Sequence, residues 1–485
     1  MKKHFIALFS FTAILAVTVC GCSKKETESV TVPDTVIENV ESFTEETPVT
    51  EEPVMEDVVV EEPVIEESTA EISPSEEEFP AWYDLYDHHK DQPDLTADGD
   101  FKNLTVQPGR KADQLYITWF SKSASQGNVT FRPESGAVPE LSANATTEPS
   151  ISVPGYYRNS ALIDDLASDT VYYYTLKNGN TLSAAYKYET MDLHSTNFTF
   201  TIAGDPELGL GDPEVLPEHQ SVWRVVLNRM KEQIPDSSFL VSTGDQVANP
   251  SSTIQYDAFL DNSLLYSTAL VPLVGNHDNG TGFFGDHFTL PNLDSLGTES
   301  GRDGNYWFRR GNVLFMILNS SCPMPFDEHE DFVRNVTRSN PDAKWRIVLS
   351  HYSPITVVDR YQGIREKFAE DYAELGLKYD IDLFIGGHDH VYTRGYFLDE
   401  EGDPIGTTEP LSSEYNNPGQ PVYMIVSSAT DALLRDPDPY PWSALSVQNG
   451  VPQLTEVQVT EDSIRVITRD ADHWTLVDDF TIYKD

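Results

Sequence analysis

Five apolar segments of this chain end beside side chains that commonly bind metal ions. The segments cover residues 198–205, 238–245, 269–278, 345–351 and 382–390. The candidate ligands at their ends are Asp205, Asp245, Asn276, His351, His388 and His390. Carboxylate and amide oxygens with imidazole nitrogens suit Fe, Mn or Zn and exclude thiolate chemistry. The set is large enough for two metal ions that share one carboxylate and together bind a phosphoryl oxygen.

The elements that must position these ligands can be read from the same part of the chain. Each apolar segment is rich in β-forming residues and ends in Gly, Ser or Asn, and residues 215–233 and 363–377 are expected to be helical. This alternation predicts βαβ units in a layered sheet covered by helices. Ligands of such sheets gather where strands end and loops begin. One such motif alone is typical of a turn or a helix cap, whereas all five in order favour a metal site.

Residues 94–193 show a different pattern from the segments that follow. Residues 115–120, 128–131, 171–176 and 185–190 read as short strands, separated by clusters of Gly, Ser, Asn and Pro. Short strands spaced by turns over about 100 residues are typical of a small antiparallel β-sandwich. The alternative is a β-rich extension of the domain that follows.

Across residues 95–485 the chain resembles the calcineurin-like metallophosphoesterases of the purple acid phosphatase type. The resemblance rests on the motifs G-D-P-E-L-G, G-D-Q-V, G-N-H-D, V-L-S-H-Y and G-H-D-H, and on a C-terminal V-D-D-F-T-I-Y-K that resembles this family's closing strand. It implies the α/β fold class: an αββα metallophosphoesterase sandwich over residues 197–485. A small all-β domain, similar to fibronectin type III, would precede it over residues 94–193.

The resemblance also implies a role for each candidate ligand. Asp245 would bridge two divalent or trivalent metal ions. The first ion would be bound by Asn276, His351 and His388, and the second by Asp205 and His390.

Two further residues carry catalytic roles by resemblance. His277 would face the leaving-group oxygen without binding metal, and Asp278 would hold its imidazolium. The chemistry favours such a pair, because the departing alkoxide of a phosphate ester needs a proton or a positively charged hydrogen-bond donor.

The sequence departs from the family pattern at two positions. The purple enzymes carry a tyrosine three residues after the bridging aspartate, where this chain has Ala248, so we expect no purple colour. Two residues after Asp205 the usual Gly or His is replaced by Glu207. One metal site is therefore expected to lack a protein ligand, which water, Glu207 or Asn249 would replace. For Glu207 itself, a supporting or capping role beside the metal is favoured, and ligation is the alternative.

Several other residue types that could do chemistry are given structural roles. His219 and His329 lie at probable helix starts and are expected at the solvated surface. His287 is expected in a loop packed over the catalytic domain, where contact with substrate is the alternative. Tyr392 and Arg394 would be structural or would shape the pocket, and Cys322 would be an ordinary thiol.

The first 93 residues predict export and attachment to a membrane. Lys2 and Lys3 precede an apolar run, and Gly21 precedes Cys22 as in a bacterial lipoprotein signal. Residues 1–22 are therefore expected to be a signal peptide, with Cys22 acylated and the catalytic domain outside the cytoplasm. An ordinary signal peptide or a short membrane helix is the alternative. Between residues 23 and 80, 19 acidic residues accompany two lysines, so residues 23–93 predict an acidic disordered tether.

The amino-acid composition argues against a nucleic-acid partner and constrains how an anionic substrate could bind. Lys and Arg total 32 against 79 Asp and Glu, a formal net charge of -47, which argues against nucleic-acid binding. The same charge gives no long-range attraction to anionic substrates, so a phosphate site must bring its own local positive charge. Three cysteines exclude a disulfide framework.

Together these patterns predict a surface-anchored, binuclear, metal-dependent phosphoesterase that acts on a phosphate ester. A preference for monoesters follows from the resemblance alone. A phosphodiesterase or nucleotidase on the same scaffold is the first alternative. A surface binding module that has kept the fold and lost catalysis is the second.

Overall fold

The computed structural model describes residues 99–485, apart from residues 212, 299, 323–324 and 431. The predicted lipoprotein signal with Cys22 and the predicted tether over residues 23–93 lie outside the described residues. Within the described part of the chain, no helix is both long and apolar enough to cross a membrane.

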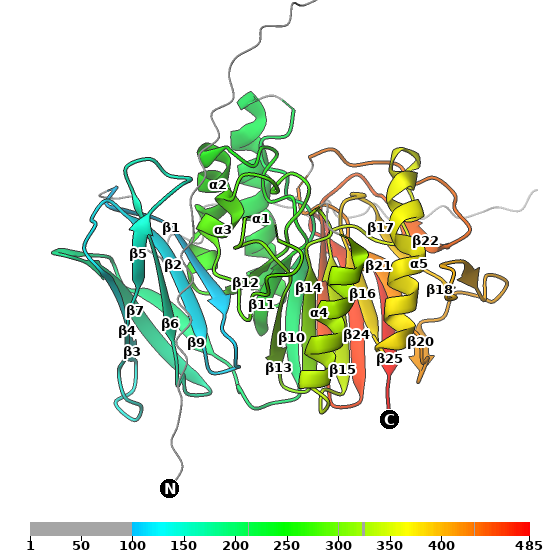
Figure 1. Ribbon diagram of the computed structural model, residues 1–485, viewed down its shortest axis with the longest axis horizontal. Helices are drawn as coiled ribbons and strands as arrows, with labels where there is room; N and C mark the ends of the chain where they lie inside the picture. The colour runs from blue at the N-terminus through cyan, green and yellow to red at the C-terminus, as the bar shows by residue number, and fades with distance from the viewer. Residues whose placement is uncertain (1–98, 212, 299, 323–324, 431) are drawn as a thin grey trace, which may run out of the picture. The chain divides into compact units, whose positions relative to one another are not determined.

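The first domain is built only of strands (Figure 1). One sheet has the order β1 (Phe101–Pro108), β2 (Leu115–Ser121), β6 (Tyr157–Ile163), β5 (Thr146–Pro149). The other has the order β4 (Leu141–Asn144), β3 (Gly127–Pro133), β7 (Thr170–Asn178), β8 (Thr181–Leu182), and β9 (Tyr186–Thr190) also pairs with β7. Alternate residues of β7 are buried, and Tyr174 stacks on Phe131 with ring centroids 4.7 Å apart. The four predicted strands are confirmed as β2, β3, β7 and β9.

The second domain contains two seven-stranded sheets, and the first of them carries three predicted ligand-bearing strands. Its order is β12 (Ala269–Pro272), β11 (Ser237–Ser242), β10 (Phe198–Ala203), β23 (Gln453–Val459), β24 (Ser463–Asp470), β25 (Leu476–Tyr483), β20 (Glu414–Asn416). The strands β10, β11 and β12 run parallel to one another. The predicted closing strand is confirmed as β25.

The other sheet carries the two remaining ligand-bearing strands. Its order is β13 (Tyr306–Arg310), β14 (Val313–Leu318), β15 (Trp345–Ser350), β16 (Leu383–Gly386), β21 (Val422–Ile425), β17 (Tyr392–Gly395), β22 (Ser443–Val447). The four strands from β14 to β21 in this order are parallel. A separate short hairpin joins β18 (Phe397–Leu398) to β19 (Pro404–Ile405).

Helices lie between many of these strands. The α-helices are α1 (Leu216–Gln233), α2 (Thr253–Leu260), α3 (Phe283–His287), α4 (Phe326–Ser339) and α5 (Gln362–Lys378). Short 3₁₀ helices cover Pro213–Val215, Ser263–Tyr266 and Asp359–Tyr361. The helices predicted over residues 215–233 and 363–377 are confirmed as α1 and α5.

The two sheets pack face to face, with helices on their outer sides (Figure 1). Along β14, alternate residues such as Met316 join a cluster with side chains of α4 and α5. The residues between them point the other way, and the Phe315 ring lies 5.4 Å from that of Phe239 in β11. The opposite faces of one strand thus contact a helix layer and a second sheet. This arrangement confirms the predicted α/β fold with an all-β domain before it.

The all-β domain is hydrogen-bonded to the α3 region of the second domain. The buried Asp286 carboxylate accepts bonds from Ser150 Oγ at 2.7 Å, from Ile151 N at 3.1 Å, and from Ser152 N and Oγ at 3.0 and 2.6 Å. Lys102 of β1 donates to Asp257 at 2.7 Å. A buried carboxylate with this many donors fixes the loop it binds, because removing it would leave buried donors without partners.

Candidate metal centre

The candidate ligands follow the carboxyl ends of parallel strands from both sheets. Asp205 lies two residues after β10, Asp245 three after β11, and His351 directly after β15. Asn276 and His388 follow β12 and β16 in the same way. Since the carboxyl ends of parallel strands meet at one edge of a sheet, this topology places all five loops together.

The His351 imidazole lies at the middle of the resulting cluster. Its Nε2 is 3.3 Å from an Asp245 oxygen and 3.1 Å from the Asn276 amide oxygen. Its Nδ1 is 3.3 Å from an Asp205 oxygen, and its ring centroid is 5.1 Å from that of His388. The ligand atoms of Asp245, His351 and His388 all lie within 4.8 Å of one another, a spacing that could hold a metal ion.

A second group of potential ligands lies beside the first and includes Glu207. One Glu207 oxygen is 3.2 Å from His277 Nε2, and the other is 3.7 Å from His390 Nε2. Ligand atoms of Glu207, Asp245 and His277 also lie within 4.8 Å of one another. Asp245 therefore belongs to both groups, as a bridging carboxylate must.

Backbone carbonyls orient two of the imidazoles. His351 Nδ1 lies 2.9 Å from the Thr243 carbonyl oxygen, and His390 Nδ1 lies 3.1 and 3.0 Å from those of Ala432 and Leu433. A carbonyl oxygen can only accept a hydrogen bond, so each Nδ1 donates to its carbonyl and each Nε2 is left to face the cluster. This is the arrangement in which histidine binds a metal through Nε2.

The loops that carry the ligands adopt conformations that are uncommon for residues other than glycine. The backbone φ is 33° at Asp205, 48° at Asp245, 72° at His388 and 57° at His390. Such angles cost energy and are concentrated at functional sites. The loops also leave no room at Gly275, where an added Cβ would lie 2.0 Å from an Asp245 oxygen.

Burial and mutual charge shift the pKa values of the clustered groups. Burial raises the pKa of Asp205 to about 7 and that of Glu207 to about 9. Burial also acts on Asp245 and His351, but their mutual attraction outweighs it, lowering the pKa of Asp245 and raising that of His351 to about 10. Burial lowers the pKa of His390 to about 4. The raised pKa values of Asp205 and Glu207 mean that the cluster lacks the positive charge that would keep these two carboxylates ionised.

The residues present fit a pair of metal ions. His388 Nε2 and one Glu207 oxygen are buried and make no hydrogen bond within the described part of the protein. Buried polar atoms are nearly always satisfied, so each points to a ligand that completes it. The donors are oxygen and imidazole nitrogen only, which suits Fe, Mn or Zn.

His277 lies at the open side of the cluster. Its backbone N–H donates to Asp245 at 2.7 Å, and its side chain is 32% exposed. Its Nδ1 lies 2.8 Å from the Ala248 carbonyl, so Nδ1 donates and Nε2 faces Glu207. A half-buried imidazole that a carbonyl holds beside two candidate ligands can approach a leaving group.

The expected contact of Asp278 with His277 is absent from the described hydrogen bonds. Asp278 is buried and accepts bonds from the backbone N–H groups of Gly275 at 3.0 Å and Gln246 at 3.2 Å. The acid therefore holds the loops that carry Asn276 and Asp245, whereas the carbonyl of Ala248 holds the His277 ring. The expectation that Asp278 holds the imidazolium was wrong in this respect.

The structure distinguishes between Asn249 and Glu207, the two side chains considered as replacements for the missing metal ligand. Ala248 lies where the purple enzymes carry tyrosine, and Asn249 is exposed and accepts a bond from Ser251 N at 3.0 Å. Glu207 is 3% exposed and faces His277 and His390. Of the two side chains considered, only that of Glu207 lies in the described cluster.

Two histidines expected at the surface are buried, so that expectation was wrong. His219 accepts a bond from Gly209 N at 3.2 Å, and His329 lies 3.2 Å from the Asn305 amide oxygen. Both belong to the buried sides of helices, α1 and α4. Neighbouring acids suggested solvent, but the position of each residue around its helix decided burial.

His287 belongs to a helix rather than the expected loop, and it lies away from solvent. It ends α3, is fully buried, and stacks on Tyr256 with ring centroids 4.2 Å apart. Its Nε2 is 3.3 Å from Asn103 Nδ2 of the all-β domain. Its position supports the junction between the domains.

The remaining residues considered from the sequence have the structural surroundings that were expected of them. Tyr392 donates to Asp478 at 2.6 Å, and Arg394 donates to the same carboxylate at 3.0 Å. Cys322 is buried in the chain after β14.

Aromatic residues near His388 were missed by the sequence reasoning. The rings of Tyr361 and Tyr352 lie 4.1 and 4.7 Å from that of His388, centroid to centroid. Tyr352 directly follows His351, so its proximity was available from the motif. Tyr361 lies in a connection before α5, where no spacing signal points to the site.

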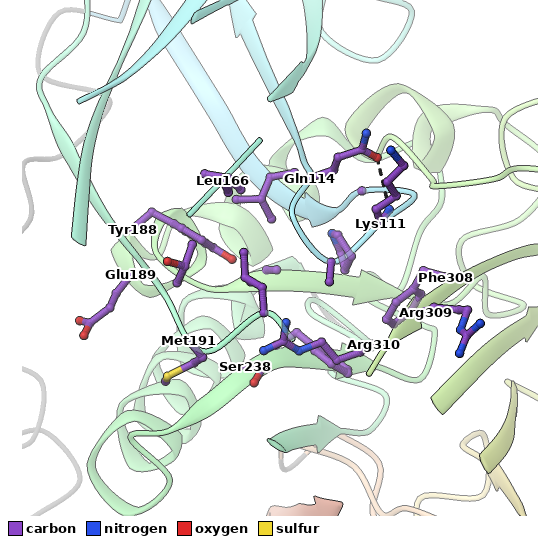
Figure 2. A pocket seen from close by; sticks show the side chains of 18 of the residues that line it. Lys111, Gln114, Leu166, Tyr188, Glu189, Met191, Ser238, Phe308, Arg309 and Arg310 are labelled. Carbon is purple, nitrogen blue, oxygen red and sulfur yellow. Dashed lines mark hydrogen bonds between the residues drawn. The ribbon is translucent and has the colours of Figure 1, made fainter. Parts of the chain in front are cut away.

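Figure 2 shows a pocket that is lined by residues of both domains. Ser238 at the start of β11 and Phe308 and Arg310 of β13 line it, together with Leu166 and Tyr188 of the all-β domain. The candidate ligand of β11 follows the opposite end of that strand, and a six-residue strand is about 20 Å long. This pocket is therefore separate from the candidate metal centre.

Comparison with known proteins gives the class of this protein. Residues 192–392 match the calcineurin-like phosphoesterase family, and residues 101–190 match the N-terminal domain of purple acid phosphatases. The chain thus carries a calcineurin-like phosphoesterase domain behind a purple acid phosphatase N-terminal domain. The two matches support a metal-dependent phosphoester hydrolase whose family uses a binuclear metal centre.

Individual relatives are distant. Two uncharacterized proteins of Mycobacterium tuberculosis, from strains CDC 1551 / Oshkosh and ATCC 25618 / H37Rv, are each 25% identical over 26% of this chain. The match spans only 28% of the length of these curated relatives. The solved structure of a purple acid phosphatase from seeds of yellow lupin (Lupinus luteus) is 16% identical, with a TM-score of 0.61. The match covers 79% of this chain and 74% of the lupin chain, and the two chains share the fold.

Proposed function

We propose that this protein hydrolyses phosphate monoesters at a binuclear metal centre. The observation that carries the proposal is the convergence of five strand-end loops on one cluster of buried carboxylates and imidazoles with a half-buried amide. Such a cluster is costly to bury unless metal ions or protons compensate its charge. When bound, two metal ions would supply Lewis acidity and an activated water.

The same proposal assigns the ligands to two ions. Asp245 would bridge them, since it belongs to both groups of ligand atoms. The predicted first set is Asn276, His351 and His388, and the predicted second set is Asp205, His390 and, in place of the missing ligand, Glu207. Glu207 is supported by its buried, unpartnered oxygen beside His390.

The protein's own groups would position and protonate the reacting ester. The Ala248 carbonyl fixes the His277 ring with Nε2 directed at the cluster. From there His277 would donate a proton, or a charged hydrogen bond, to the departing oxygen. No side chain is expected to form a covalent phosphoenzyme.

Metal analysis and hydrolysis assays test this proposal together. We expect the purified full chain to bind two metal ions and to hydrolyse p-nitrophenyl phosphate, with activity lost on chelation and restored by Mn, Zn or Fe. Asp245→Asn should lose metal and turnover while keeping its circular dichroism spectrum. Asp169→Asn is a matched control, because Asp169 also has a positive φ, 49°, but is exposed.

The outcomes separate the enzyme from the alternatives. Less than one metal ion per chain, with no turnover after reconstitution, would refute the hydrolase and leave a surface binding module. Faster cleavage of diesters than of monoesters would instead favour a phosphodiesterase or nucleotidase.

We also propose that the catalytic domain is exported and held at the cell membrane through acylated Cys22. The support is the sequence of residues 1–22 and the acidic segment behind it. In a bacterial host, the full chain should partition into detergent and incorporate labelled palmitate, whereas Cys22→Ser should do neither. Equal behaviour of the two proteins would contradict the anchor.

A further inference from the structure

A phosphate substrate at the candidate metal centre would gain from a positively charged side chain in addition to the two proposed metal ions. The side chains of this centre include the carboxyls of Asp205, Asp245 and Glu207, and the whole chain carries a formal charge of -47. This charge repels a phosphate ester at long range. Recognition is therefore favoured by a fixed cationic donor next to the centre, because charge-assisted hydrogen bonds to phosphate are the strong ones. Arg435 has this position.

The backbone before Arg435 is attached to the centre. The carbonyl oxygens of Ala432 and Leu433 accept the hydrogen bond from His390 Nδ1 at 3.1 and 3.0 Å. Arg435 follows only two residues later. The backbone that leads to Arg435 is therefore hydrogen-bonded to His390, a predicted metal ligand.

The guanidinium of Arg435 is held by an aromatic contact that also reaches the centre. Its Cζ lies 5.2 Å from the ring centre of Tyr361, a cation–π distance. The Tyr361 ring lies 4.1 Å from that of His388. Arg435 Nε is buried and makes no hydrogen bond to any described residue. One donor of the guanidinium is thus positioned and unused.

We propose that Arg435 binds a non-bridging phosphoryl oxygen and makes the site prefer monoesters to diesters. The inference rests on the proposed function and names the residue that sets its substrate class. A monoester has three non-bridging oxygens and close to two negative charges near neutral pH, whereas a diester has one oxygen and about one charge fewer. The planar guanidinium matches phosphate oxygens in geometry and charge, so the extra oxygen gains most from it.

Paired substrates test this inference on the metal-loaded full chain. We expect Arg435→Gln to lower kcat/KM for p-nitrophenyl phosphate by about 10- to 100-fold, mainly through KM. The loss for bis(p-nitrophenyl) phosphate should be several-fold smaller, and the metal content should stay unchanged. Arg435→Lys should be intermediate and provides a second variant if the glutamine variant does not fold.

Arg360→Gln is the matched control. Arg360 Cζ also lies 5.0 Å from the Tyr361 ring centre, but this arginine is exposed. The ratio of monoester to diester kcat/KM should not change in this variant. An equal change of the ratio in Arg360→Gln, or an equal loss for both esters in Arg435→Gln, would overturn the assignment.

Binding of inorganic phosphate distinguishes this inference from the proposed function. If the metal-loaded wild-type protein cleaves neither ester, the proposed hydrolysis fails, and calorimetry with inorganic phosphate then decides the role of Arg435. Weaker phosphate binding by Arg435→Gln than by Arg360→Gln would support the arginine as a phosphate ligand. Equal binding by the two variants would refute it.

Discussion

The residue that most distinguishes this centre is Glu207. Its carboxylate occupies the space between His277 and His390, where the sequence also lacks the tyrosine of the purple enzymes. Glu207→Gln keeps the shape but removes the negative charge. We expect it to weaken binding of one metal equivalent by at least about tenfold, measured by competition with a chromogenic chelator.

Glu366→Gln provides the comparison for Glu207→Gln, because Glu366 lies exposed on α5. It should bind both metal equivalents like the wild-type protein. If Glu207→Gln also retained both with unchanged affinity, Glu207 would only support its neighbours.

The role of His277 can be tested by comparing substrates that differ in the basicity of their leaving groups. An alkoxide needs a proton more than p-nitrophenolate does, because it is the stronger base. His277→Asn should therefore lower kcat by about 100- to 10,000-fold for an alkyl phosphate, with a much smaller loss for p-nitrophenyl phosphate. Equal losses for the two substrates would mean that His277 does not act on the departing oxygen.

At the scale of elements, the site depends on how closely the ligand-bearing loops pass one another. An added Cβ at Gly275, in the loop after β12, would lie 2.0 Å from an oxygen of Asp245, in the loop after β11. Gly275→Ala must push the two loops apart. We expect metal binding and turnover to be lost while the protein stays folded, as judged by metal analysis and circular dichroism.

The same substitution elsewhere in the chain separates this effect from a general intolerance of alanine. Gly363 lies in α5 with no atom within 4 Å of an added Cβ. Alanine there should leave metal content and activity unchanged. Full metal content in Gly275→Ala would show that the loops can adjust.

At the scale of the whole molecule, the strands and the polar residues at their ends could be predicted from the sequence, because both are local patterns. Five apolar runs in order, each stopping beside a potential metal ligand, indicate strand ends without any knowledge of the contacts around them. Glu207 was left between two roles, and Arg435 and Tyr361 were missed, because their roles depend on contacts between distant segments. The burial of His219 and His329 was also mispredicted, since acidic neighbours in sequence lie on other sides of the helix.

Two buried histidines outside the candidate ligand set should make the free energy of unfolding depend on pH. Burial lowers the pKa of His287 to about 4, although Asp286 and Asp257 oppose it, and burial aided by Lys367 lowers that of His329 to about 4. In the unfolded chain both would titrate near 6.5. Between these values the unfolded state binds more protons, so stability falls as pH falls from about 6.5 to 4.

Each histidine should contribute up to about 1.4 kcal/mol per pH unit to this slope. The measurement is the free energy of urea unfolding of the metal-free protein at several values of pH. His287→Gln and His329→Gln should each have a shallower slope than the wild-type protein, whatever their stability at neutral pH. His194→Gln, which replaces an exposed histidine, should keep the wild-type slope. If all three variants kept that slope, neither buried imidazole would remain neutral in the folded protein, and the buried hydrogen bonds of His287 and His329 would have to accommodate a charge.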